Sequence, residues 1–211
     1  MRAEYLPYCR PALDEDDIQA VAATLRSGWL TTGPKVVEFE REFAAASGTR
    51  HAIALSSCTA ALHVGLLAAG VGPGDEVVTP ALSFVAGANT IVQTGATPVF
   101  CDVDATSLCA TAEQIAAALT ARTKAVLTMH FAGRPAAAAP IVALCKPRGI
   151  AVVEDAALAV GMLDDGAWPG TRTTAAAFSF YATKNVTTAE GGMLVTNDDA
   201  VAERASGAKQ A

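Results

Sequence analysis

The sequence predicts an α/β fold: a three-layer α/β/α sandwich around a mostly parallel sheet of roughly seven strands. Short apolar runs rich in valine, isoleucine, alanine and leucine alternate with amphipathic stretches along the chain. Most of these runs are nearly continuous, which is typical of parallel strands covered on both faces. No low-complexity linker or internal repeat interrupts the alternation, so we expect right-handed crossovers and a doubly wound sheet.

The individual elements follow from apolar runs of strand length and from the capping residues of the stretches between them. Strands are predicted at Ala52–Ser56, Glu76–Thr79, Thr97–Val103, Ala125–His130, Ile150–Glu154, Ala175–Phe180 and Met193–Thr196. The helical stretches begin with acidic residues, a proline or an N-cap threonine, and most end before a glycine. Helices are predicted at Asp14–Ser27, Val36–Ser47, Thr59–Ala69, Ala86–Thr94, Thr111–Leu119 and Ala136–Arg148, with a last one around Arg204–Gly207.

Composition excludes several classes of protein. Hydrophobic residues make up 52% of the 211 residues and charged ones 17%, which excludes intrinsic disorder. The 15 basic and 21 acidic residues give a net charge of −6, which argues against nucleic acid or an anionic membrane as the main partner. No apolar run could span a bilayer and Met1–Tyr5 lacks a signal-peptide pattern, so a cytoplasmic location is expected. Five cysteines without CxxC spacing favour free thiols over a metal site or a disulfide framework.

A lysine lies just beyond one of the predicted strands, in Ser179-Phe180-Tyr181-Ala182-Thr183-Lys184-Asn185. A lysine that bonds covalently to a carbonyl must be held rigidly and be partly desolvated, so that its amine can lose its proton. A strand end meets both needs. An ordinary solvated lysine remains the alternative when Lys184 is considered alone.

The predicted strand at Ile150–Glu154 is followed at once by Asp155. An aspartate at the carboxyl end of a parallel strand lies where open α/β sheets bind their ligands. A carboxylate there can pair with a protonated heterocyclic nitrogen, as in sites for a pyridoxal ring. The alternative is that Asp155 caps a helix.

The segment Leu55-Ser56-Ser57-Cys58-Thr59-Ala60 is typical of a strand, a small polar turn and a helix start. Free N–H groups at a helix start, with serine and threonine hydroxyls, form a phosphate site, although the same pattern also occurs without a ligand. One sheet can bring this turn, Asp155 and Lys184 to a single edge. The two charged residues are 184 − 155 = 29 positions apart, enough for one crossover. Phe84 offers an aromatic face for a ring.

Collinear blocks along the whole chain carry a resemblance to a known family. They are Ser27–Pro34, Ser56–Leu62, Gly72–Val77, Gly95–Val99, Arg122–Ala125, Glu154–Ala157, Ser179–Tyr181, Thr183–Asn185 and Glu190–Gly192. In these blocks the sequence resembles the DegT/DnrJ/EryC1/StrS sugar aminotransferases, enzymes of aminotransferase fold type I. Within that group it looks most similar to the UDP-4-amino-4-deoxy-L-arabinose aminotransferase branch.

The resemblance implies a cofactor, a reaction and a set of residues. The cofactor is pyridoxal 5′-phosphate, to which Lys184 would bond covalently before moving a proton, and Asp155 would keep the ring nitrogen protonated. An amino acid, glutamate, would donate its amino group to a nucleotide-linked keto sugar, as in lipopolysaccharide or antibiotic sugar biosynthesis, and the enzyme would be a homodimer. The cofactor-binding residues implied by position are Ser57, Thr59, Ala60, Phe84, Asp155, Leu158, Ser179 and Lys184.

The sequence departs from the family pattern in several places. Leu158 stands where glutamine or histidine usually lies near the phenolic oxygen of the cofactor, and Cys58 stands where glycine or alanine is usual. Family members are longer and carry a small C-terminal domain. Residues 1–211 are therefore expected to be the cofactor-binding large domain, with 1–35 leading into it and the small domain absent.

Three alternatives remain open at this stage. The chain could be a truncated or decayed paralogue that binds the cofactor or a partner chain without turnover. A nucleotide-dependent oxidoreductase is disfavoured because the first strand–helix turn lacks GxGxxG. A dehydratase of the same family would carry histidine in place of Lys184.

Overall fold

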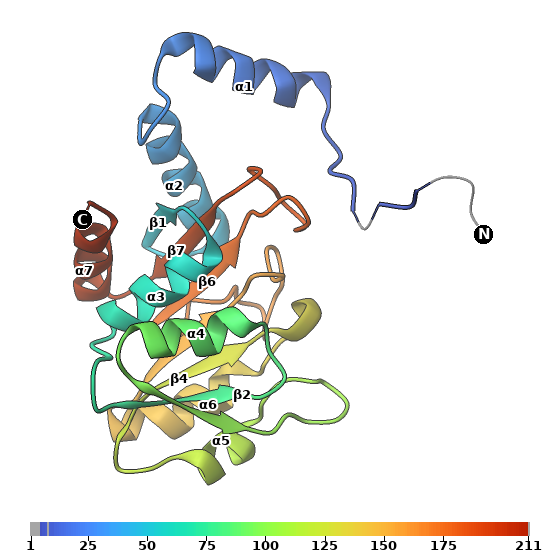
Figure 1. The fold of residues 1–211 in the computed structure, drawn as a ribbon. Helices are drawn as coiled ribbons and strands as arrows, with labels where there is room; N and C mark the ends of the chain where they lie inside the picture. Colours follow the sequence, from blue (N-terminus) through green and yellow to red (C-terminus); the bar gives the residue numbers. More distant parts are fainter. Residues whose placement is uncertain (1–4, 8, 211) are drawn as a thin grey trace.

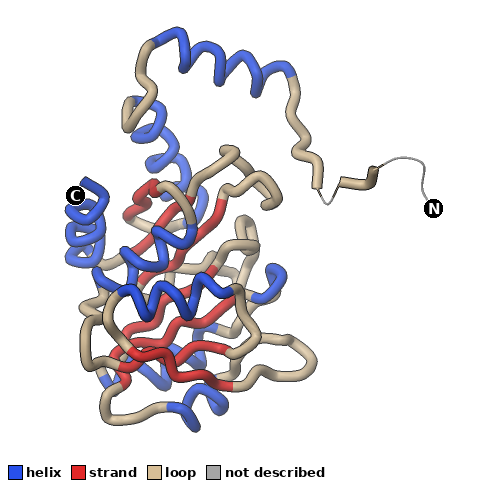
Figure 2. The backbone as a smooth tube through the Cα atoms, in the orientation of Figure 1, coloured by secondary structure: helices blue, strands red, loops and turns tan. Residues whose placement is uncertain are grey.

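Seven strands form one mixed sheet in the computed structural model, which describes residues 5–7 and 9–210 (Figure 2). The strand order is β1-β7-β6-β5-β4-β2-β3. β7 runs antiparallel to both of its neighbours, and the other pairs are parallel. The strands are β1 (His51–Leu55), β2 (Glu76–Pro80), β3 (Thr97–Cys101), β4 (Thr123–Met129), β5 (Ala151–Asp155), β6 (Ala175–Ser179) and β7 (Gly192–Thr196).

Helices cover both faces of this sheet, which confirms the predicted three layers (Figure 1). One apolar core joins α3, α4 and α7 to one face, while α2, α5 and α6 close the other face over two further cores. The helices are α1 (Glu15–Ser27), α2 (Pro34–Ser47), α3 (Cys58–Ala68), α4 (Val85–Gln93), α5 (Ala112–Ala118), α6 (Ala138–Cys145) and α7 (Asp199–Gln210), with short 3-10 turns η1 (Phe131–Gly133) and η2 (Lys146–Arg148).

The first helix, α1, projects away from the sheet and has no buried residue (Figure 1). Asp14 caps it in a capping box with Asp17, and Gly28 ends it with φ 80°. Local capping therefore fixes where α1 begins and ends, although no other described element packs over it.

All seven predicted strands and all predicted helices are present, although several boundaries differ from the prediction by one to three residues, and two of these differences have a clear structural reason. The helix expected at 136–148 begins only at Ala138, because Ala137 has φ 50° and the Ala136 N–H binds the His130 side chain; its last three residues form η2. The strand expected to reach Val103 ends at Cys101, where its neighbour β2 also ends.

Two expectations concern the membrane and the N-terminus. Within the described residues, none of the helices combines the length and the apolar character that crossing a bilayer would require. Residues 1–4, on which the signal-peptide argument mainly rests, lie outside the described part of the chain.

Candidate active site

A pocket of about 390 Å³ opens where β4, β5 and β6 end and α3 begins. The carboxyl ends of these parallel strands meet at one edge of the sheet, which is where α/β proteins of this type bind ligands. The pocket brings together all three segments that the sequence singled out. It is lined by Ser57, Cys58, Thr59, Leu62, Phe84, Ala86, Met129, Asp155, Ala157, Leu158, Ser179, Tyr181, Lys184 and Glu190.

The start of α3 provides hydrogen-bond donors to this pocket. Ser57 is the N-cap: its Oγ accepts from the Ala60 N–H at 3.1 Å, and its carbonyl oxygen accepts from the Ala61 N–H at 3.0 Å. The N–H groups of Cys58 and Thr59 have no hydrogen-bond partner among the described residues. Two unpaired N–H groups at the positive end of a helix dipole favour an anion.

Ala60 differs from the other predicted phosphate contacts. It is not among the residues that line the pocket, and its N–H is already engaged by the Ser57 hydroxyl. Thr59 and Ser179 do line the pocket, and the Ser179 Oγ accepts from the Tyr181 N–H at 3.4 Å.

Asp155, the last residue of β5, places a carboxylate in the pocket wall with 3% of its surface exposed. Its Oδ1 accepts from the Ala157 N–H at 3.0 Å and lies 3.9 Å from the Cys58 Sγ. Burial raises the pKa of this carboxyl above its ordinary value of 3.8, while the Ala157 N–H and the positive charge of Lys184 partly offset that rise. No helix begins here among the described residues, so Asp155 is not a helix cap.

Lys184 lies in the loop after β6, and it is the only lysine among the described residues that line the pocket. Its backbone N–H donates to the Tyr181 carbonyl at 2.9 Å. The side chain is half-buried, and its amine has no ion-pair or hydrogen-bond partner among the described residues. Its charge lowers the pKa of Asp155, so the two groups interact across the pocket.

Phe84 and Leu158 complete the predicted set. Phe84 occupies the N-cap position of α4 with 65% of its surface exposed, so its ring borders the pocket without being packed into the core. Leu158 follows Asp155 in the turn after β5 and offers only apolar surface.

Sequence patterns did not identify several lining residues. Cys58 lies beneath Asp155, its thiol donates to the Ala177 carbonyl at 3.5 Å, and burial together with the Asp155 charge raises its pKa well above 9.0. Met129 pairs with Asp155 in the β4–β5 register, so its position as the last residue of β4 was the available signal. Tyr181, two residues after Ser179, is detectable by the same strand-end argument.

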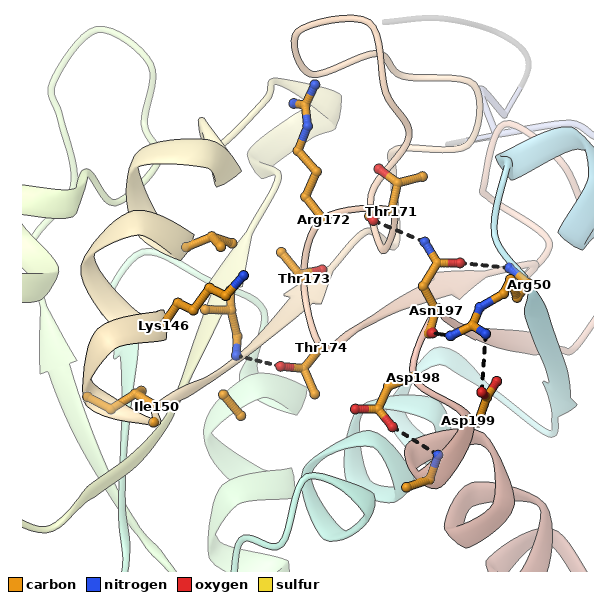
Figure 3. A pocket seen from close by; sticks show the side chains of 15 residues that line it. Arg50, Lys146, Ile150, Thr171, Arg172, Thr173, Thr174, Asn197, Asp198 and Asp199 are labelled. Atoms are coloured by element: carbon orange, nitrogen blue, oxygen red, sulfur yellow. Dashed lines mark hydrogen bonds and ion pairs between the residues drawn. The ribbon is translucent and has the colours of Figure 1, made fainter.

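A wider groove of about 770 Å³ lies at the opposite edge of the sheet, between α6 and α7 (Figure 3). Most of its polar groups satisfy one another: Arg50 binds Asp199 and Asn197, and Arg172 donates to the Asp164 carbonyl at 2.9 Å. Among the described basic side chains that line the groove, Lys146 is the one without a hydrogen-bond or ion-pair partner, and it points into the groove (Figure 3). Among the described residues, the groove does not bring an unpaired carboxylate, an unpaired lysine and a helix start together, whereas the smaller pocket does. The smaller pocket is therefore the candidate active site.

A family model, the DegT/DnrJ/EryC1/StrS aminotransferase family, matches residues 11–210. The chain belongs to this family. Family members depend on pyridoxal phosphate, which agrees with the expected fold type and cofactor. The family assignment thus rests on nearly the whole chain rather than on the pocket alone.

Known relatives agree with the family assignment. The spore coat polysaccharide biosynthesis protein SpsC of Bacillus subtilis (strain 168) is 50% identical over 203 residues, which are 96% of this chain and 52% of SpsC. The PLP form of Spr1654 from Streptococcus pneumoniae has a TM-score of 0.89 at 32% identity, covering 95% of this chain and 57% of Spr1654. DesI in the presence of its TDP-sugar product has a TM-score of 0.83 at 39% identity, covering 90% of this chain and 48% of DesI. The chain therefore spans about half the length of these relatives.

Proposed function

We propose that this chain is the cofactor-binding large domain of a pyridoxal-phosphate-dependent aminotransferase that acts on a nucleotide-linked keto sugar, with glutamate as the amino donor. One observation carries the proposal: a single pocket joins an open helix start, a buried carboxylate and an unpaired lysine from three distant segments. The family supports the aminotransferase class, and the TDP-sugar product of DesI supports a nucleotide sugar as acceptor.

The residues present fit the cofactor. A phosphate monoester needs donors, and the Cys58 and Thr59 N–H groups are unpaired at the start of α3. A protonated ring nitrogen needs an anion, and the Asp155 Oδ2 has no hydrogen-bond partner among the described residues. A buried carboxylate with a raised pKa gains most from an added cation, because the cation replaces the lost solvation.

When bound, pyridoxal phosphate supplies a carbonyl that bonds to amines and a ring that accepts the electron pair released as a C–H bond breaks. The Asp155 carboxylate would hold a proton on the ring nitrogen, and Phe84 would lie against one face of the ring. Ser57, Thr59 and Ser179 would bind the phosphate together with the α3 N–H groups. The pocket would thus fix both ends of the cofactor.

Lys184 would act as the base of the reaction. Lys184 is half-buried and its amine has no partner among the described residues, so it can accept a proton from the α-carbon of the donor and release it again.

We also propose that two copies of the chain associate. Ile18, Val21 and Leu25 form one apolar stripe along α1, and each exposes more than half of its surface, at 53%, 62% and 61%. The stripe continues to Trp29, beside a cavity of about 430 Å³ between α1 and α2. A continuous exposed apolar surface of this kind is typical of an interface.

The function is tested by adding pyridoxal phosphate and following its absorbance near the visible edge, then reducing with borohydride and mapping the adduct by peptide mass. We expect the adduct on Lys184. A second assay measures glutamate-dependent amination of a UDP-4-keto sugar. Cofactor binding without turnover would support the binding-only alternative, and an adduct on Lys124 or Lys146 would contradict the assigned site.

A further inference from the structure

The first residue of β7, Gly192, lies unusually close to the turn that opens α3. Gly192 pairs with Leu55 in β1 and with Ser179 in β6, so it is held in the sheet on both sides. The Ser57–Cys58 peptide passes directly over it. A Cβ at Gly192 would lie 2.5 Å from the Cys58 nitrogen and closer still to the carbonyl carbon and oxygen of Ser57.

This approach requires glycine for reasons of space. The φ of Gly192 is not positive, so an L-residue could adopt its backbone conformation. The atoms that a Cβ would meet are backbone atoms, which cannot rotate away as a side chain would. Either the strand or the α3 turn would have to shift, and the strand is fixed by its two neighbours.

The turn that would shift is the one that carries the unpaired N–H groups of Cys58 and Thr59. We propose that Gly192 is a positioning residue for the anion site: β7 forms the seat that holds the α3 turn in place for a phosphate group. This inference deepens the proposed function and rests on it where the phosphate is that of the cofactor.

Two other glycines show that the requirement is specific. A Cβ at Gly72 would meet nothing within 4 Å, and its φ is not positive, so Gly72→Ala is a matched control. At Gly191, next to Gly192, the nearest obstacle is the Thr188 hydroxyl, a side-chain atom that can move. Only Gly192 among these three lies against the backbone of the phosphate turn.

The test compares dissociation constants for pyridoxal phosphate and for pyridoxal, which lacks the phosphate, in the full chain and its Gly192→Ala and Gly72→Ala variants. The dissociation constant for pyridoxal divided by that for pyridoxal phosphate measures how much the phosphate contributes to affinity. Loss of a hydrogen bond to a charged group lowers affinity about 10- to 150-fold, so we expect Gly192→Ala to reduce this ratio about 10- to 150-fold and Gly72→Ala to leave it unchanged. An unchanged ratio in Gly192→Ala, including the case in which both ligands lose affinity by the same factor, would overturn the inference while leaving the proposed function intact.

A second measurement does not depend on the cofactor or on folding of the variant. Inorganic phosphate is titrated into the unmodified chain, and the amide resonances are followed by NMR. We expect the signals of Cys58, Thr59 and Gly192 to move together and saturably, while that of Gly72 stays still. Absence of movement at Cys58 and Thr59, or movement there without Gly192, would also overturn the inference. Failure of pyridoxal phosphate to bind alongside the expected phosphate response would reject the proposed function alone.

Discussion

The charge on Asp155 can be removed with little change of shape by Asp155→Asn. In the wild type, the Ala157 N–H donates to Asp155 Oδ1 at 3.0 Å. The amide oxygen of the variant can accept the same hydrogen bond, so the turn after β5 should persist. The wild-type carboxylate exposes 3% of its surface, and burial raises its pKa. Without cofactor, the variant should therefore be at least as stable as the wild type at neutral pH, because it buries no charge.

The expected loss appears when the cofactor is present. A hydrogen bond to a charged group contributes about 1.5–3 kcal/mol, so cofactor affinity should fall about 10- to 150-fold. In the variant, the ring nitrogen of the cofactor would no longer be held protonated. Loss of one such electrostatic partner slows the reaction about 100-fold or more. The assay follows the absorbance change of the bound cofactor after glutamate is added, under single-turnover conditions.

The matched control is Asp164→Asn. The Asp164 Oδ2 also accepts a backbone N–H, from Ala138 at 2.7 Å, but Asp164 does not line the pocket. Equal rates for wild type and Asp155→Asn would refute the role of Asp155, as would an equal loss in the control.

The difference in folding stability between the wild type and Asp155→Asn should depend on pH with a definite sign. Because the pKa of Asp155 is raised in the folded state, that state binds the proton more tightly than the unfolded chain does. The wild type should therefore lose stability relative to Asp155→Asn as the pH rises from about the ordinary value of 3.8 through the raised pKa. Urea unfolding across this range without cofactor measures the difference; a gain of wild-type stability with rising pH would contradict the burial argument.

Three further predictions concern other residues. Lys184→Ala should abolish covalent cofactor attachment and leave the far-ultraviolet circular dichroism unchanged, whereas a borohydride-reducible adduct in this variant would exclude Lys184. Leu158→His should slow cofactor loss in dialysis, because it adds a hydrogen-bonding group to the pocket wall; Leu163→His, at a residue that does not line the pocket, is the control and should change nothing. The apolar stripe on α1 should drive association of the chain, and a clean monomer by light scattering at micromolar concentration would contradict this.

Much of the fold could be predicted because the information is local. A strand such as β5 is a continuous apolar run, and α1 carries its own capping residues, so neither requires knowledge of distant contacts. The errors arose where distant contacts intervened. Ala136 looked like part of a helix, but its N–H binds His130 at the end of β4, and the helix begins two residues later.

The candidate site was predictable in part for the same reason. Asp155 and Lys184 each follow a strand, and Ser57 precedes a helix, so their edge of the sheet could be inferred. Cys58 and Met129 were missed as lining residues, because a thiol or a thioether at a strand or helix end has no distinctive pattern.

The sequence by itself determined the three layers, the positions of the strands and helices, and the family to which the chain belongs. These depend on apolar periodicity, capping and short motifs, which are properties of neighbouring residues. Only the tertiary structure decided that β7 runs antiparallel between β1 and β6, and that its Gly192 lies under the Ser57–Cys58 peptide. These residues are far apart in the sequence, and their approach depends on how the whole sheet packs, which no local pattern records.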